Sequence, residues 1–395
     1  MHSSILGTYK GSKLSFVKGR GSYLITKGGK KYLDFASGIA VNSLGHCNPE
    51  LIKALYDQSK KIWHTSNAFK INEQEKLANK LTNMTFANKV FFCNSGAEAV
   101  EAAIKIARAY HQIEKKKNRF KIITIKGSFH GRTIATISAS GQKKLVDGFK
   151  PLVDGFTQVD FGDHDSFEKL IDKKTAAIMI EPILGEGGIK VIPNECLEGL
   201  RKLCDKKGIL LIFDEVQCGV GRTGKLFAYQ WSKIKPDILA TAKGIGGGFP
   251  IGACLVTNKV SKGMKFGSHG STFGGNPLAC SVANKVLEII SKKNFLNNMN
   301  KNALFFRNNL EEIKNTYDHL IEEIRGKGFL LGVKCKINNS IIIEKLITNG
   351  LLIIGASENV IRILPPLNVK RKDLKIALKI IEKTFNNIGN KNEKN

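Results

Sequence analysis

The most informative segment of the sequence is Asp237-Ile238-Leu239-Ala240-Thr241-Ala242-Lys243-Gly244-Ile245-Gly246-Gly247-Gly248-Phe249-Pro250. The apolar run from Ile238 to Ala242 predicts a buried strand that ends at a single lysine, Lys243. Glycines follow Lys243 at once, and they remove side chains that would block the approach of a planar ligand. An amine in this setting can form a Schiff base with an aldehyde cofactor. The same pattern also suits a surface lysine before a flexible turn.

A second apolar run lies upstream and ends in an acid. The run from Ile209 to Phe213 predicts another buried strand, which leads into Asp214-Glu215-Val216-Gln217. Open α/β sheets bind their ligands at the carboxyl ends of the strands. Pyridoxal phosphate needs a lysine for its aldehyde and an acid for its pyridinium nitrogen. We therefore expect Lys243 and Asp214 to be the catalytic residues of a pyridoxal phosphate site.

The composition limits the class of protein. A chain of 395 residues with 42% hydrophobic residues can bury a large core and is expected to form two domains. No apolar run is long enough to span a membrane, and Met1 to Gly7 lack the pattern of a secretion signal. The eight cysteines form no Cys-x-x-Cys pair, which argues against a metal or redox motif and fits reduced thiols. We expect a cytoplasmic enzyme without a metal.

The net charge of +28 suggests a nucleic-acid-binding protein as an alternative. The basic residues are scattered, however, with only short clusters such as Lys115 to Lys117 and Lys370 to Lys372, and no aromatic residues are interleaved with them. Gly219 to Lys225 matches glycine-rich phosphate-loop patterns, but Leu226 stands where Ser or Thr should hold the metal. A nucleotide- or nucleic-acid-binding protein is therefore a distant alternative, and the basic surface could instead attract anionic substrates.

Strand and helix patterns alternate from about residue 86 to residue 260. This alternation predicts an α/β fold with a mainly parallel sheet covered by helices. Residues 22–35 are typical of a β-hairpin, and the polar end of the chain from residue 389 is expected to fray. Strands are expected at 89–93, 121–125, 176–180, 329–334 and 351–354, and helices at 50–61, 73–83, 100–110, 276–292 and 373–386, with a further long helix after 300.

Three further segments carry side chains that could contact a cofactor or substrate. Asn94-Ser95-Gly96-Ala97-Glu98 turns from a strand into a helix, where free N–H groups can hold a phosphate, or it is only a helix cap. Phe129 could stack on a planar ring and Arg132 could bind a carboxylate, or they are a core and a surface residue. Glu186 lies among glycines that allow it to swing, or it is a solvated turn acid.

These segments resemble the motifs of the class III aminotransferases of the ornithine and acetylornithine type. The resemblance rests on Asp214 to Gln217, on the Thr-Ala-Lys-Gly setting of Lys243, and on Gly270-Ser271-Thr272-Phe273-Gly274-Gly275-Asn276-Pro277. The motifs occur in the family's order from about Gly38 to about Pro366. Because these enzymes depend on pyridoxal phosphate and have fold type I, the resemblance implies the same cofactor and fold.

The resemblance also implies how the chain is divided and assembled. A large domain, residues 61–290, would bind pyridoxal phosphate. A smaller α+β domain would be built from both chain ends, residues 1–60 and 291–395. The family forms homodimers with shared active sites, and Thr272 would reach the cofactor phosphate of the partner subunit.

The same resemblance assigns roles to single residues. Phe129 would stack on the cofactor ring, Gln217 would lie near the ring hydroxyl, and Ala97 replaces a threonine of many members, which leaves backbone donors for the phosphate. The implied cofactor contacts are Ser95, Gly96, Ala97, Phe129, Asp214, Gln217, Lys243 and Thr272, and the implied substrate contacts are Arg132, Ser271, Glu186 and Arg362. Glu186 would pair with Arg362. His46 and His130 receive no part in the proton chemistry.

The substrate expectation comes from the resemblance alone. Gly38 to Pro49, Trp63 to Asn67 and Ser128 to Thr133 resemble the members that act on N-acetylornithine. The implied reaction moves the ω-amino group of N2-acetylornithine to 2-oxoglutarate and gives N-acetylglutamate 5-semialdehyde and glutamate, a step of arginine biosynthesis. Succinyl-diaminopimelate is a further candidate substrate, and ornithine and 4-aminobutyrate aminotransferases are alternatives within the same class.

Overall fold

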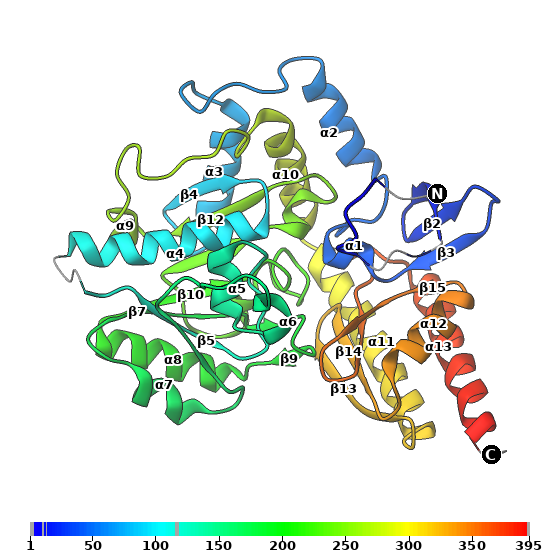
Figure 1. Ribbon diagram of the computed structural model, residues 1–395. Helices are drawn as coiled ribbons and strands as arrows, with labels where there is room; N and C mark the ends of the chain where they lie inside the picture. Colours follow the sequence, from blue (N-terminus) through cyan, green and yellow to red (C-terminus); the bar gives the residue numbers. More distant parts are fainter. Residues whose placement is uncertain (1–3, 10–11, 13, 115–117, 393–395) are drawn as a thin grey trace.

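The computed structural model describes residues 4–9, 12, 14–114 and 118–392 (Figure 1). The lysine cluster Lys115 to Lys117 and the first three residues, on which part of the secretion-signal prediction rests, lie outside the described residues. Within the described ranges, no helix has both the length and the apolar character needed to cross a membrane.

The larger part of the molecule is built on a seven-stranded sheet with the order β4-β12-β11-β10-β7-β5-β6. Strand β12 runs antiparallel to both of its neighbours, and all other neighbouring strands are parallel. The strands are β4 (Lys89–Cys93), β12 (Gly252–Val256), β11 (Ile238–Thr241), β10 (Leu210–Asp214), β7 (Thr175–Ile180), β5 (Lys121–Ile125) and β6 (Phe156–Val159). The predicted, mainly parallel sheet is confirmed.

The central strands are apolar along their whole length because both faces of the sheet are covered. In β10, Leu210 and Ile212 belong to the hydrophobic cluster on the face of helix α4 (Gly96–Ile113), whereas Leu211 and Phe213 belong to the cluster on the opposite face. Helix α8 (Asn194–Lys207) packs on β10. Burial on both faces explains the unbroken apolar runs in the sequence.

The smaller part of the molecule combines both ends of the chain (Figure 1). Strand β15 (Leu351–Leu352) pairs in parallel with β3 (Lys31–Asp34). On its other side β3 pairs with β2 (Tyr23–Thr26), which pairs in turn with β1 (Phe16–Arg20). A second sheet has the order β13 (Ile321–Lys327), β14 (Leu330–Cys335), β17 (Val360–Ile363), β16 (Ile354–Ala356). The helices of this smaller part are α11 (Phe295–Thr316), α12 (Asn339–Thr348) and α13 (Arg371–Asn392). Both ends of the chain thus contribute to one α+β unit, whereas the domain boundaries at residues 60 and 290 stay a prediction.

Most predicted elements are present with shifts of one or a few residues. The remaining helices are α1 (Ser37–Ala40), α2 (Pro49–Ser59), α3 (Asn72–Met84), α5 (Ile134–Ser140), α6 (Lys143–Val146), α7 (His164–Leu170), α9 (Asn258–Ser261), α10 (Pro277–Ile290), η1 (Ala228–Trp231) and η2 (Lys243–Gly246), and the remaining strands are β8 (Ile183–Leu184) and β9 (Lys190–Val191). The fraying expected from Gly389 is wrong as far as Asn392, because α13 continues to that residue.

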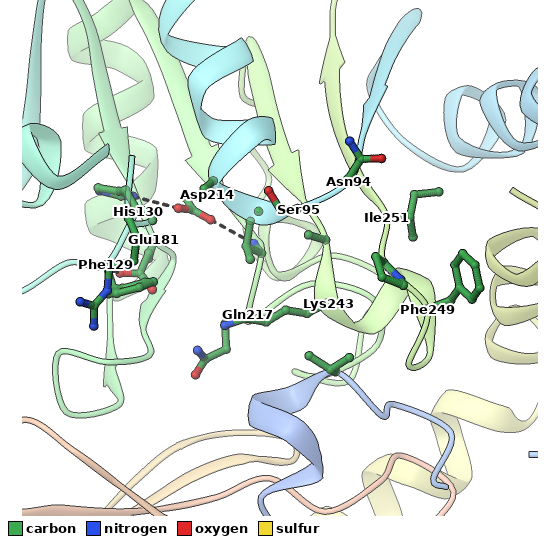
Figure 2. A pocket seen from close by; sticks show the side chains of 18 of the residues that line it. Asn94, Ser95, Phe129, His130, Glu181, Asp214, Gln217, Lys243, Phe249 and Ile251 are labelled. Atoms are coloured by element: carbon green, nitrogen blue, oxygen red, sulfur yellow. Dashed lines mark hydrogen bonds and ion pairs between the residues drawn. The ribbon is translucent and has the colours of Figure 1, made fainter. Parts of the chain in front are cut away.

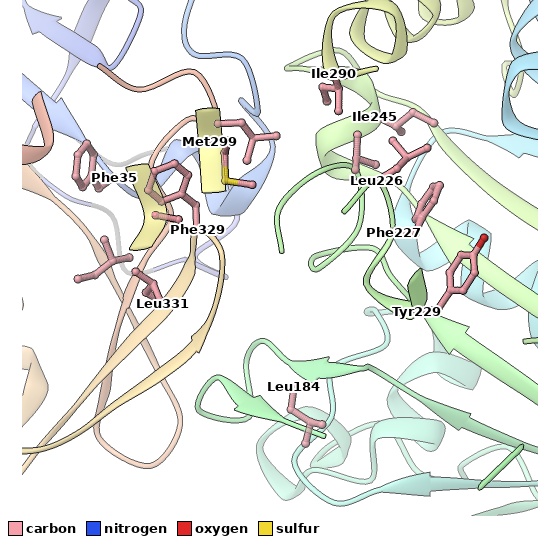
Figure 3. Close-up of a cluster of buried hydrophobic side chains, with 14 of the residues drawn as sticks. Phe35, Leu184, Leu226, Phe227, Tyr229, Ile245, Ile290, Met299, Phe329 and Leu331 are labelled. Carbon is pink, nitrogen blue, oxygen red and sulfur yellow. The ribbon is translucent and has the colours of Figure 1, made fainter. Parts of the chain in front are cut away.

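One hydrophobic cluster joins the two parts (Figure 3). It brings Leu226 and Ile245 of the larger part together with Met299 and Phe329 of the smaller part. The glycine-rich loop 219–225 lies at this junction, where Arg222 is buried and donates to the carbonyls of Phe329 and Pro365. The loop that matched a phosphate-loop pattern is therefore covered by protein, and this excludes a nucleotide phosphate at Arg222.

Candidate active site

A cavity of about 390 Å³ lies at the carboxyl ends of the parallel strands (Figure 2). The segments that follow β4, β5, β7, β10 and β11 all contribute to its lining. Val41 and the segment 248–251 contribute further lining residues. Five strand ends meet here because the strands run in the same direction, which is the arrangement that open α/β sheets use for ligands.

Lys243 projects into the cavity directly after the buried strand β11. It opens η2 with a φ of 47°, an uncommon left-handed conformation for a residue with a side chain. Burial, together with the nearby Arg362 guanidinium, lowers the pKa of Lys243 to about 8. A lysine amine with a lowered pKa is a better nucleophile at neutral pH.

Asp214 ends β10 and is buried against His130. The Nδ1–H of His130 donates to Oδ2 of Asp214 at 2.8 Å, and the Val216 N–H donates to Oδ1 at 3.0 Å. Both contacts leave the carboxylate fixed in one orientation at the cavity wall (Figure 2). The sequence analysis gave His130 no role, and its position next to Phe129 in a strand-end loop was the signal that could have placed it there.

Glu181 is a second buried carboxyl group at the cavity, at the end of β7. Its oxygens accept the N–H groups of Phe129 at 2.8 Å and of Gly185 at 3.1 Å. Burial and the nearby Asp214 carboxylate raise the pKa of Glu181. Glu181 thus holds the loop that carries Phe129 and His130, and the sequence analysis missed this role.

The start of helix α4 forms another part of the wall. The Ser95 hydroxyl caps the helix by accepting the Glu98 N–H at 3.2 Å, and the Glu98 carboxylate accepts the Asn94 N–H at 2.7 Å. The N–H groups of the first helical residues, Gly96 and Ala97, have no partner within a helix. A Cβ at Gly96 would lie 2.6 Å from Val216, so glycine permits the close approach of this turn to the Asp214 segment.

Phe129, Arg132 and Gln217 complete the predicted residues of the cavity. The Arg132 guanidinium is exposed and lies 5.6 Å from the centre of the Phe129 ring. The Oε1 atom of Gln217 accepts a hydrogen bond from Nη1 of Arg362 at 3.0 Å. Gln217 therefore connects the cavity to a buried arginine of the smaller part.

Arg362 of β17 and Glu186 of the loop between β8 and β9 form the predicted ion pair. Nη2 of Arg362 lies 3.0 Å from Oε2 of Glu186, and the arginine side chain is 3% exposed. Burial lowers the pKa of Arg362, and Glu186 opposes that effect. The structure thus brings together two groups that are 176 residues apart in the sequence.

Ser271 and Thr272 lie outside this cavity. The Ser271 hydroxyl accepts a hydrogen bond from Nδ2 of Asn94 at 3.2 Å and faces a neighbouring cavity, and Thr272 is exposed. Their predicted contacts with substrate and with the partner's cofactor phosphate remain predictions.

The residues of the cavity fit pyridoxal phosphate. The α4 N-terminus offers backbone N–H groups for the phosphate, Asp214 offers a buried carboxylate for the ring nitrogen, and Phe129 offers an aromatic face. Lys243 offers the amine. Among the described residues, no group of three or more His, Cys, Asp or Glu side chains could hold a metal ion.

The fold and this set of residues define a pyridoxal-phosphate-dependent transferase. Comparison with known proteins narrows the class. The chain belongs to the class-III aminotransferases, whose family profile matches residues 8–385.

Similar proteins cover almost the whole chain. An acetylornithine aminotransferase from Mesorhizobium japonicum is 52% identical over 376 residues, which are 95% of this chain and 94% of that protein. The ornithine aminotransferase of Toxoplasma gondii, whose structure has pyridoxal phosphate at partial occupancy in the active site, has a TM-score of 0.94 at 33% identity and covers 99% of this chain and 94% of its own. The acetylornithine aminotransferase of Elizabethkingia anophelis has a TM-score of 0.87 at 35% identity, with 96% of each chain covered. Family and neighbours imply pyridoxal 5'-phosphate as the cofactor.

Proposed function

We propose that this chain moves the ω-amino group of N2-acetylornithine to 2-oxoglutarate and gives N-acetylglutamate 5-semialdehyde and glutamate, a step of arginine biosynthesis. The observation that carries the substrate is the 52% identity to an acetylornithine aminotransferase over 95% of the chain. Ornithine is less favoured, because relatives that are 45–52% identical over 95–97% of the chain are named acetylornithine aminotransferases, whereas the ornithine aminotransferase of Toxoplasma gondii is 33% identical.

Three residues at the cavity would perform the transfer of the amino group. Bound pyridoxal phosphate supplies an aldehyde for amine exchange and a ring that accepts electrons. The Nζ atom of Lys243 would take a proton from the substrate carbon that carries the amine and donate it to the cofactor carbon that receives the amine, as general base and acid. The carboxylate of Asp214 would stabilise the positive charge on the ring nitrogen, and His130 would hold that carboxylate in place.

Two arginines would allow one pocket to accept two unlike substrates. N-acetylornithine presents one carboxylate remote from its reacting amine, which Arg132 would bind at the cavity. Glutamate presents a second carboxylate beside the reacting amine, which Arg362 would bind after Glu186 moves away. The pair between Glu186 and Arg362 supports this exchange, because it keeps the buried arginine neutralised when no second carboxylate is present.

A homodimer would complete the site. Ser271 and Thr272 do not line the cavity of their own chain, and the apolar side chain that follows them, Phe273, is exposed. Exposed apolar groups of this kind are typical of an interface between subunits. Sedimentation of the holoenzyme should give twice the chain mass, and a monomer that retains full activity would contradict a shared site.

A cytoplasmic location is part of the proposal. All eight cysteines are free, and six of them are buried, as expected for a protein folded in a reducing compartment.

The experiment that tests the function compares four amino donors with 2-oxoglutarate as acceptor. The kcat/KM values should be measured for N-acetylornithine, succinyl-diaminopimelate, ornithine and 4-aminobutyrate. We expect the highest value for N-acetylornithine. A higher kcat/KM for ornithine or 4-aminobutyrate would contradict the proposed substrate and would identify an ornithine or 4-aminobutyrate aminotransferase of the same family.

A further inference from the structure

Glu186 bridges two cations. Its Oε2 atom lies 3.0 Å from Nη2 of Arg362, and its Oε1 atom lies 3.6 Å from Nζ of Lys144. The two cations differ in surroundings, because the Arg362 side chain is 3% exposed whereas the Lys144 side chain is 56% exposed. The carboxylate, which is 29% exposed, therefore lies between a buried partner and a solvent-facing partner.

Lys144 is held beside the cavity by its own short helix, α6. The neighbouring Gln142 side chain donates to the Ser128 carbonyl at 2.7 Å, directly before Phe129 in the chain. The apolar residues Leu145 and Val146 are buried in a cluster that Phe129 contacts. The helix is thus fixed to the cavity wall, whereas the Lys144 side chain remains free to follow Glu186.

The Glu186 side chain lies in a loop of glycines whose backbone is anchored. Gly185, Gly187 and Gly188 flank Glu186, and Gly188 has a φ of 98° that side chains rarely adopt. The Glu186 carbonyl accepts the Ser357 N–H at 2.9 Å, so the backbone is anchored while the side chain has freedom to turn.

We infer that Lys144 is the alternative ion-pair partner of Glu186. When a substrate carboxylate binds Arg362, the Glu186 carboxylate leaves Arg362 and pairs with Lys144 alone. This inference rests on the proposed function, because a carboxylate beside the reacting amine is what displaces Glu186. Without a second cation, the displaced carboxylate would lose its only partner. Lys144 is therefore a positioning residue that acts through Glu186 and favours the glutamate and 2-oxoglutarate half of the reaction.

Lys143 provides a matched control. It lies on the same helix and has the same charge, but its Nζ atom lies 3.6 Å from Oδ2 of Asp147, whereas Lys144 is the lysine that pairs with Glu186. A general effect of positive charge on anionic substrates would be lost equally in Lys143→Met and Lys144→Met. An effect that passes through Glu186 would be lost only in Lys144→Met.

The test uses the holoenzyme and two readouts. The first readout is the dissociation constant of glutarate, an unreactive dicarboxylate, which calorimetry measures. The second is the pair of KM values for 2-oxoglutarate and N-acetylornithine. Because exposed ion pairs are weak, we expect Lys144→Met to weaken glutarate binding and to raise the KM for 2-oxoglutarate by about twofold to fivefold. The KM for N-acetylornithine should change less, Lys144→Arg should restore the wild-type values, and salt should narrow the difference.

Three results would overturn the inference. Equal losses in Lys143→Met and Lys144→Met would assign the effect to general charge. Tighter glutarate binding in Lys144→Met would mean that Lys144 holds Glu186 on Arg362 rather than receiving it. Unchanged values in Lys144→Met, in an enzyme that uses 2-oxoglutarate, would refute the role of Lys144 and leave the proposed function intact. A wild-type enzyme that neither binds glutarate nor uses 2-oxoglutarate would refute both.

Discussion

The His130 imidazole and the Asp214 carboxylate form a buried pair, with Nδ1 of His130 at 2.8 Å from Oδ2 of Asp214. The pair lies at the cavity wall (Figure 2), and the Nε2 atom of His130 has no hydrogen-bond partner within the described part of the chain. A buried carboxylate needs such partners to remain charged. His130 therefore supports the group that faces the cofactor's ring nitrogen in the proposed mechanism.

Removing the imidazole should weaken catalysis while the fold persists. His130→Phe keeps a ring in the same place but cannot donate to Asp214, and a hydrogen bond to a charged group is worth ~1.5–3 kcal/mol, so we expect kcat to fall about tenfold or more. Asp214→Asn should cost at least as much, because an amide cannot stabilise a positive ring nitrogen as a carboxylate can. Steady-state kinetics with the thermal unfolding midpoint as a control would decide, and full activity in either variant would contradict the assigned role.

The two arginines should differ in which half-reaction they serve. Arg362→Ala removes the partner of the carboxylate beside the reacting amine, so the glutamate half-reaction should slow far more than the acetylornithine half-reaction. Arg132→Ala is the matched control and should slow both, because both substrates carry a remote carboxylate. Single-turnover absorbance changes measure each half separately. Equal losses in both halves for Arg362→Ala would refute the exchange between Glu186 and substrate.

The amine of Lys243 should react at a lower pH than an ordinary lysine. Burial, and to a smaller extent the positive charge of Arg362, lower its pKa from the usual 10.5 to about 8. Roughly one Lys243 amine in ten is therefore unprotonated at pH 7. The rate at which cofactor-free protein captures pyridoxal phosphate should rise with pH and level off above about 8. Arg362→Ala removes a nearby cation and should move the midpoint upward. A midpoint near 10 in the wild type would contradict this environment.

The buried Glu215 carboxyl group should make the protein less stable as the pH rises. Burial raises its pKa to about 8 from 4.5, so the folded state holds a proton that the unfolded chain releases. Stability should therefore fall between about pH 4.5 and pH 8. Glu215→Gln cannot titrate and should show a shallower fall in the unfolding midpoint across this window.

The Glu215→Gln protein should also have a lower unfolding midpoint at acidic pH, because Glu215 accepts the N–H groups of both Ala228 and Tyr229 and an amide has one acceptor oxygen. Parallel midpoint curves for the two proteins would contradict the shifted pKa.

The sequence predicted the central sheet well and placed Lys243 and Asp214 at strand ends, because local patterns carry that information. Strands β4 and β5 begin and end as predicted, since buried parallel strands are continuous apolar runs. Lys243 and Asp214 stand at the ends of two such runs. A strand end points to a ligand site without any knowledge of distant contacts.

The sequence could not predict features that depend on distant contacts or on irregular pairing. The contact between His130 and Asp214 joins residues 84 positions apart, and it exists because β7 separates β5 from β10 by a single strand. Strand β13 was missed because a register shift between Ile321 and Glu323 breaks the alternation that identifies strands. The end of α13 was missed because its polar composition hides the fact that Phe385 and Ile388 are buried.

In the proposed mechanism, Lys243 binds the cofactor and carries the proton transfer. Borohydride reduction of the holoenzyme, followed by peptide mapping, should place the pyridoxyl label on Lys243. Lys243→Ala should carry no label and should lose far more than the ~10²–10⁴-fold that acid–base assistance alone contributes. A label on any other lysine, or substantial turnover by Lys243→Ala, would rule out this role of Lys243.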